Sequence, residues 1–323
     1  MGSQAESKIT VTEQNFRRAE SDMYFSNSVK MSGFGKLAHI REVMPIDHQT
    51  VIRANRDTLY SSGVFDLEAG PVTLTLPDPG KRFMSVQAID EDQYALVTEY
   101  APATCTFSRT NVETRYLMLG VRTFVDPSDP KDLAAAHALQ DAIKVEQKGE
   151  GSFEIPDWDS VSRDKVRKEL LKRGAKIPDT KRMYGPRGKV DPERHLIGTA
   201  TGWGANAPEN ATYVPVIPAQ NDGKVVHRLT VKGDVPVDGF WSVSVYGADG
   251  YFKQNPQNAY TINNVTAKED ADGSVTIQFG GCNGSAPNCI PITEGWNYWV
   301  RLYRPRREIL DGTWTFPEAR PVK

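Results

Sequence analysis

Polar residues that could carry out chemistry are most concentrated in the strand-like run from Asn55 to Tyr60. Arginine binds oxyanions through paired N–H groups, and a carboxylate can act as a general base. We therefore predict a catalytic group in which Asp57 is the base, Arg56 the anion clamp and Tyr60 the proton donor. Asn55 would bind the substrate beside them. A second interpretation stays open, a buried structural network in which Asp57 pairs with Arg56 or accepts backbone amides.

A second group of candidate residues lies further along the chain, at His195 and in Gly202-Trp203-Gly204. Glycines beside an aromatic residue let the backbone approach a ligand closely, so Trp203 could form a stacking wall. We predict that His195 and Trp203 bind substrate, and a tryptophan that fills the core is the open alternative. His195 lacks the spacing of any metal motif, and we predict no metal site.

A third group of candidate residues is the aromatic and basic run Trp299, Arg301, Tyr303 and Arg304. Arginine between aromatic side chains can stack on them and pair with an anion. We predict that Arg301 and Tyr303 contact the substrate, with Arg301 stabilising negative charge that develops during the reaction. A ladder of long side chains on a sheet surface is the alternative.

Several classes of function are excluded by what the sequence lacks. It contains no GxSxG elbow, no HExxH pair, no phosphate-binding glycine loop and no GxGxxG after a strand, so the cofactor stays unknown. The balance of 39 basic and 41 acidic residues argues against nucleic acid as a partner. No apolar run reaches the roughly 18 residues that span a bilayer. We expect a small-molecule substrate, and a homo-oligomer stays open.

The cysteines and the first residues of the chain indicate the cellular compartment in which the protein is found. Cys282 and Cys289 bracket a short tip, which predicts a disulfide formed in an oxidising environment; two free thiols are the alternative. The start, Met1-Gly2-Ser3, resembles an added tag joined to a mature terminus. We therefore expect that a signal peptide has been removed and that the protein is periplasmic or secreted.

The elements that must position these residues are mainly strands. Residues 240–246 alternate, with Trp241, Val243 and Val245 on one face, and 275–279 and 297–303 continue the pattern. Strand-like runs also fill 51–124, whereas helical spacing opens the chain and recurs at 130–143 and 160–173. Residues 176–194 have no periodicity and are expected to form a linker or a surface loop.

These patterns predict a mainly β protein. We expect two packed antiparallel β-sandwich or jelly-roll-like domains, an N-terminal helix and a helical connecting segment. The predicted boundaries are 10–125 for the N-terminal β domain, 126–194 for the helical segment and linker, and 195–323 for the C-terminal β-sandwich.

Several segments resemble two known families. The run Asn55-Arg56-Asp57-Thr58-Leu59-Tyr60, followed by Asp66-Leu67 and Gly70-Pro71, resembles the core motif of domain-of-unknown-function family 1254. Three later stretches resemble domain-of-unknown-function family 1214: Asp238-Gly239-Phe240-Trp241-Ser242-Val243 with Tyr246, Asp272-Gly273-Ser274-Val275, and the segment from Trp296 to Trp314. The resemblance implies a two-domain β protein that is often exported, and some relatives carry carboxylesterase-like labels. It supplies no catalytic residues.

Two functions follow from these observations. The first is an enzyme, a hydrolase or a lyase, that acts on a small organic substrate in a pocket near the domain interface. It would use a carboxylate base and an arginine that stabilises an anion. The second is a non-catalytic envelope or carbohydrate-binding module, because a β-sandwich does not determine function.

Overall fold

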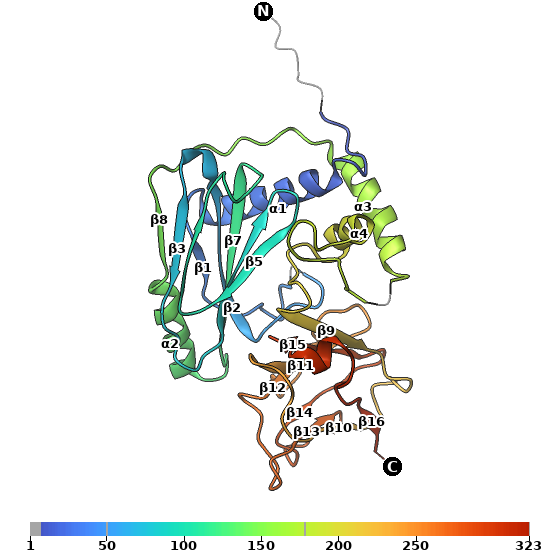
Figure 1. The fold of residues 1–323 in the computed structure, drawn as a ribbon. Coiled ribbons are helices and arrows are strands. Elements are labelled where there is room, and N and C mark those ends of the chain that lie inside the picture. Colours follow the sequence, from blue (N-terminus) through green and yellow to red (C-terminus); the bar gives the residue numbers. More distant parts are fainter. Residues whose placement is uncertain (1–7, 50, 178, 323) are drawn as a thin grey trace, which may run out of the picture. The chain divides into compact units, whose positions relative to one another are not determined.

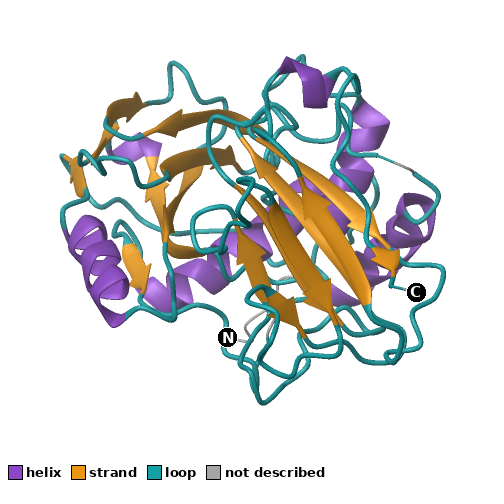
Figure 2. Cartoon of the chain, turned by 90° about the horizontal axis from the view of Figure 1, so that it is seen from below, coloured by secondary structure: helices purple, strands orange, loops and turns teal. Residues whose placement is uncertain are grey.

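The fold is mainly β, as predicted. The computed structural model describes residues 8–49, 51–177 and 179–322. Strands make up most of its regular structure, and several helices accompany them (Figures 1 and 2). The chain divides into two compact units, each built from segments that are far apart in the sequence. The first unit is Met1–Ile40, Tyr60–Thr123 and Ala138–Pro208, and the second is Arg41–Leu59, Phe124–His137 and Glu209–Lys323.

Two sheets form the β part of the first unit. One has the strand order β1-β2-β7-β4-β5 and the other the order β6-β3-β8. Their strands are β1 (Ala38–Ile40), β2 (Thr58–Asp66), β3 (Val72–Leu76), β4 (Met84–Asp90), β5 (Ala95–Tyr100), β6 (Ala103–Phe107), β7 (Tyr116–Phe124) and β8 (Lys144–Gln147). Alternating apolar residues of both sheets meet in one core, which includes Val72, Leu74, Val86 and Leu119. This shared core makes the pair of sheets a sandwich.

Three helices of the first unit pack against one another. They are α1 (Phe16–Ser32), α3 (Ser160–Gly174) and α4 (Pro192–Gly202). Phe16, Leu170 and Leu196 each come from a different one of these helices and lie in one apolar cluster. The short helices η1 (Leu67–Ala69), α2 (Pro130–Asp141) and α5 (Arg307–Leu310) lie elsewhere in the chain.

The described residues from Lys176 to Asp191 form no helix or strand, which agrees with the linker or loop predicted for 176–194, except that helix α4 already begins at Pro192. The Asp191 side chain caps this helix by accepting the N–H groups of Glu193 and Arg194, and Pro192 occupies its first turn. His195 is therefore a helical residue. The segment from Ala138 to Pro208 lies within the first unit, although the predicted ranges assign it to a connecting segment and to a second domain.

The second unit is also a sandwich of two sheets. Their strand orders are β12-β11-β15-β9 and β14-β13-β10-β16. The strands are β9 (Ala211–Val216), β10 (His227–Val231), β11 (Trp241–Tyr246), β12 (Thr261–Asn263), β13 (Val275–Phe279), β14 (Cys289–Ile290), β15 (Asn297–Tyr303) and β16 (Arg320–Pro321). Trp241, Val243 and Val245 all enter the core between the sheets, which confirms the predicted face of β11. The β13–β14 pair is parallel.

Two further observations concern the cysteines and the membrane. Cys282 and Cys289 form the predicted disulfide, and Cys105 is free. Of the helices within the described residues, none is long and apolar enough to cross a bilayer.

Candidate functional site

The face of β11 and β15 that points away from the sandwich core is polar. Because alternate strand residues point to opposite faces, this face receives Ser242, Ser244 and Tyr246 from β11 and Trp299, Arg301 and Tyr303 from β15. In register, Ser242 lies opposite both Arg301 on β15 and Asn263 on β12. We call this face, together with the segment 53–57 described next, the polar layer.

Segment 53–57 lies on this face and is held by hydrogen bonds. The Tyr246 hydroxyl donates to the Ala54 carbonyl at 2.8 Å, and Arg301 Nη2 donates to the Arg53 carbonyl at 2.8 Å. Asn55 Nδ2 donates to the Tyr303 hydroxyl at 3.2 Å. Residues almost 250 positions apart thus meet within the second unit.

Asp57 lies in the polar layer with 0% of its surface exposed. Its Oδ1 atom accepts hydrogen bonds from Asn263 Nδ2 at 3.1 Å and from the Thr261 hydroxyl at 3.4 Å. Its Oδ2 atom has no partner with hydrogen-bond geometry among the described residues, and neither does the nearby hydroxyl of Ser242. Burial raises the pKa of Asp57, while the positive charge of Arg301 and the surrounding polar side chains oppose this shift.

Arg301 carries the opposite charge in the polar layer and is 3% exposed. Its Nη1 atom donates to Ser244 Oγ at 2.9 Å, and its Nη2 atom donates to the Tyr246 hydroxyl at 2.7 Å. Burial lowers the pKa of Arg301, but Tyr246, Tyr303 and Asp57 outweigh it and raise that pKa above its ordinary value. Arg301 therefore stays charged, although no described carboxylate lies within ion-pair distance of it.

Arg56 points to different partners. Its Nη1 atom donates to the Met44 carbonyl, and its guanidinium carbon lies 5.3 Å from the centre of the Tyr260 ring. Burial lowers the pKa of Arg56. Strand β2 begins at Thr58, so the prediction that Arg56 and Asp57 lie within a strand is wrong. Asp57 therefore lies directly before the first residue of the strand.

Three of the predicted site residues, Tyr60, His195 and Trp203, belong to the first unit. The Tyr60 ring lies 5.6 Å from the Arg122 guanidinium. The ring nitrogens of His195 lie 2.9 and 3.1 Å from the carbonyls of Met183 and Asp92, and burial lowers the pKa of this histidine.

Trp203 donates from Nε1 to the Ser21 hydroxyl at 3.0 Å and stacks on Tyr24 with ring centres 4.4 Å apart. Its indole N–H and one ring face are therefore already in contact with the protein. The structure thus brings Asn55, Asp57, Arg301 and Tyr303 together in the second unit. Within the described residues, no group of three His, Cys, Asp or Glu side chains could hold a metal ion.

The sequence prediction missed a group of buried carboxylates in the first unit. Asp22 on α1 is 0% exposed and accepts a hydrogen bond from Trp158 Nε1 at 2.8 Å. Burial raises its pKa to about 7, and the negative charges of Glu91 and Asp92 add to the shift. Burial likewise raises the pKa of Asp90 to about 6. The sequence does carry one signal for this group, the run Asp90-Glu91-Asp92 at the end of an apolar strand. Carboxylates are rarely buried without partners, so this run indicates an interaction site for charged side chains.

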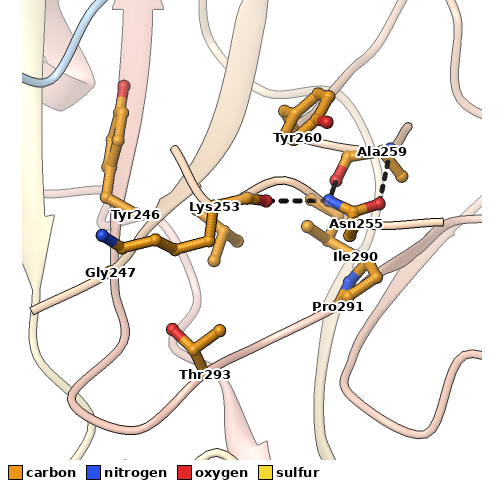
Figure 3. A pocket seen from close by; sticks show the side chains of 10 residues that line it. Tyr246, Gly247, Lys253, Asn255, Ala259, Tyr260, Ile290, Pro291 and Thr293 are labelled. Atoms are coloured by element: carbon orange, nitrogen blue, oxygen red, sulfur yellow. Dashed lines mark hydrogen bonds between the residues drawn. The ribbon is translucent and has the colours of Figure 1, made fainter. Parts of the chain in front are cut away.

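Among the cavities formed by described residues of the second unit are two that Asp57 does not line. The larger has a volume of about 200 Å³ and is bordered by Trp241, Asn264 and the acidic residues Asp234 and Glu269. The smaller measures about 10 Å³, which is room for a single water molecule. Figure 3 shows the smaller one, where Asn255 Nδ2 donates to the carbonyls of Lys253 and Ala259.

Comparison with protein families finds two matches. Residues 34–104 match the family described as a protein of unknown function (DUF1254), and residues 218–307 match the protein of unknown function family DUF1214. The two matches cover separate parts of the chain. The DUF1254 match contains Asp57, and the DUF1214 match contains Asn263 and Arg301. The segments matched by the two family models therefore both contribute residues to the polar layer of the second unit.

Solved structures share the fold of this chain. The VPA0106 protein from Vibrio parahaemolyticus is 18% identical with a TM-score of 0.75, and the alignment covers 96% of this chain and 98% of that one. An uncharacterized protein from Burkholderia cenocepacia is 14% identical with a TM-score of 0.52, covering 96% and 88%. At these identities the likeness concerns the fold alone. Comparison with curated proteins finds no match.

Proposed function

We propose that the protein is an exported, non-catalytic binding module whose small polar ligand occupies the cavity beside Trp241. The observation that carries this proposal is the contrast between that cavity and the predicted catalytic residues. The cavity is about 200 Å³ and has exposed polar residues at its border. Asp57 and Arg301 are 0% and 3% exposed and are bonded to protein groups. A ligand needs an accessible site, which the cavity offers.

Export to the periplasm or the exterior belongs to the same proposal. What supports it is the Cys282–Cys289 disulfide, since such bonds persist mainly in oxidising compartments. Localisation of a tagged full-length protein in its natural host would test this part. Recovery of the protein in the cytoplasm with Cys282 and Cys289 reduced would contradict it.

The binding role can be tested with a library of small polar molecules and two-dimensional NMR of the labelled protein. The amide signals of Gly233, Gly239 and Gly273 and the indole signal of Trp241 report on the cavity because these residues line it. We expect at least one compound to shift these four signals together. A complete screen in which no compound moves them would contradict the proposed function.

A second candidate function is catalysis, and one observation favours it. The pKa of Asp57 is raised and its Oδ2 atom lacks a partner among the described residues, which are features of a general base. In this role the protein would be a hydrolase, for example on a carboxylic ester, or a lyase, with Arg301 stabilising negative charge. Because Asp57 has no exposed surface, a substrate could reach it only if the protein groups around it moved.

Asp57→Asn separates the two candidates, because it keeps the shape of the side chain and removes its charge. A catalytic Asp57 predicts a loss of at least about 100-fold in rate, with a stably folded protein. A structural Asp57 predicts a loss of stability and no effect on ligand binding in the cavity at temperatures where the variant is folded.

A further inference from the structure

We infer that Asn283 is a modification site, at which the chain itself converts this asparagine into aspartate or isoaspartate without an enzyme. The backbone nitrogen of Gly284 attacks the side chain, and Ser285 stabilises the negative charge that develops. Water is the co-reactant. This inference is independent of the proposed binding function, because Asn283 does not line the cavity beside Trp241.

Asn283 lies in the short loop that the Cys282–Cys289 disulfide closes. Asn283, Gly284 and Ser285 are all exposed and lie outside the helices and strands. Apart from the neighbours of Gly284 in the chain, no described atom lies within 4 Å of a Cβ added at this glycine. Solvent therefore reaches the reacting groups, and a ring that forms here breaks no hydrogen bond of a helix or sheet.

Gly284 is well suited to supply the attacking nitrogen. This nitrogen must approach the Cγ atom of Asn283, and glycine has no Cβ to obstruct the approach. Gly284 has a φ of +88°, a conformation that residues with a side chain rarely adopt. Its N–H group donates a hydrogen bond to no described residue, so no bond has to break first. The sequence contains no other Asn-Gly pair.

Ser285 places two hydrogen-bond donors on the oxygen that becomes negative. Its backbone N–H donates to Asn283 Oδ1 at 3.1 Å, and its hydroxyl donates to the same atom at 2.6 Å. When the Gly284 nitrogen adds to Cγ, the electrons of the C=O bond move onto Oδ1. Hydrogen bonds to a charged acceptor are stronger than those to a neutral one, so both bonds strengthen in the transition state.

The reaction takes up water and releases ammonia. Hydroxide removes the Gly284 amide proton, the bond from nitrogen to Asn283 Cγ forms, and the Nδ2 group takes a proton and leaves as ammonia. Water then opens the succinimide ring at either of its two carbonyls, which gives aspartate or isoaspartate. Each conversion adds one negative charge to the formal net charge of -2 at pH 7. Because the ammonia is lost to solvent, the modification accumulates with the age of the molecule.

Incubation of the full-length, disulfide-bonded protein at about pH 8 tests the site, since hydroxide acts as the base in this step. Peptide mapping by mass spectrometry should find the replacement of NH₂ by OH on the peptide that contains Asn283. Enzymatic methylation of isoaspartate should label the same peptide.

Asn111 is the internal control, because it is also exposed but its groups are engaged. Its Oδ1 atom accepts the Ser108 backbone N–H at 2.7 Å, and its Nδ2 atom donates to the Thr106 carbonyl at 3.1 Å. The N–H group of the following residue, Val112, donates to the Ser108 carbonyl at 2.9 Å. Asn111 should therefore remain asparagine while Asn283 is converted.

Variants separate the roles of the attacking nitrogen and the donors. Ser285→Ala removes the hydroxyl and should slow the conversion about two- to tenfold, the equivalent in rate of one net hydrogen bond. Ser285→Thr is the matched control, because it keeps the hydroxyl and should react close to the wild-type rate. Gly284→Ala places a Cβ beside the nitrogen at a positive φ and should slow the conversion at least about tenfold.

The chain unfolded in guanidinium chloride is the reference for the Ser285 hydrogen bonds, which it lacks. The folded protein should convert Asn283 about two- to tenfold faster than this reference. If Asn283 stays intact in the folded protein while the unfolded chain is converted, the inference is wrong. Equal rates in wild type, Ser285→Ala and the unfolded chain would contradict the role of Ser285. Equal conversion of Asn111 and Asn283 would contradict the assignment of the site.

Discussion

At Asp57 and Arg301, two opposite charges lie in the same buried layer without touching. Asp57 is bonded to Asn263 and Thr261, and Arg301 to Ser244 and Tyr246. Their attraction acts through the low-dielectric interior, where a charge without a counter-charge is costly. The pair is therefore best understood as mutual neutralisation inside the polar layer.

This neutralisation predicts the effect of Asp57→Asn on stability. The variant leaves the Arg301 charge unbalanced, so we expect the free energy of unfolding to fall by about 3–5 kcal/mol. Chemical denaturation at pH 7 would measure it. In a double-mutant cycle with Arg301→Met, the two losses should be less than additive, because either change removes the same interaction. Full stability of Asp57→Asn would contradict this mutual neutralisation.

Asp22 predicts a pH dependence of stability. Its pKa rises from the ordinary value of 3.8 to about 7 in the folded protein. Between these pH values the folded state holds a proton that the unfolded chain releases, so this group makes the protein less stable as pH rises from about 4 to about 7. Asp22→Asn should remove that dependence and stabilise the protein at pH 8 by about 2–4 kcal/mol relative to wild type.

Urea unfolding of wild type and Asp22→Asn at pH 5 and pH 8 would measure this difference. Asp90 and Glu91 also have raised pKa values, so only the difference between the two proteins isolates Asp22. Asp157→Asn is the matched control, because Asp157 is exposed and lies next to Trp158. Equal pH slopes in wild type and Asp22→Asn would overturn the assignment.

At the scale of elements, α4 shows how a cap defines a helix that periodicity does not reveal. The Asp191 carboxylate satisfies two N–H groups of the first turn that have no partner within the helix. Asp191→Ala should therefore lower the free energy of unfolding by about 1 kcal/mol. Thermal unfolding would detect it, and Asp191→Asn should recover most of the loss because asparagine also caps. No recovery by asparagine would mean that capping is not the cause.

At the scale of the whole molecule, the disulfide is a covalent constraint on a short loop. Cys282 and Cys289 are seven positions apart, so the bond restricts the unfolded chain only slightly. Replacing both by serine should cost about 2–3 kcal/mol at most, whereas Cys105→Ser should change stability little. Calorimetry would compare the variants. Intact-mass analysis of the native, alkylated protein should find one free thiol, and three would contradict the bond.

Local patterns in the sequence were sufficient for much of the architecture. Alternation predicted β11 and β15 and the face of Trp241, because a strand with one buried face must place apolar residues at every second position. The short segment between Cys282 and Cys289 predicted their bond, since nearby cysteines in a turn can meet without help from the rest of the fold. The helix at 160–173 followed from its apolar spacing. The family resemblance came from short runs of residues that are contiguous in the sequence.

Tertiary structure alone decided what the polar residues do. Asp57, Asn263 and Arg301 are far apart in the sequence, and nothing local indicates that they meet or that the chain buries them. The same holds for Asp22, whose raised pKa comes from burial beside Trp158 and from carboxylates about 70 positions away. A titration shift depends on desolvation and on distant charges, and both exist only once the chain is folded. The sequence could therefore name candidate residues, while burial determined which of them a ligand can reach.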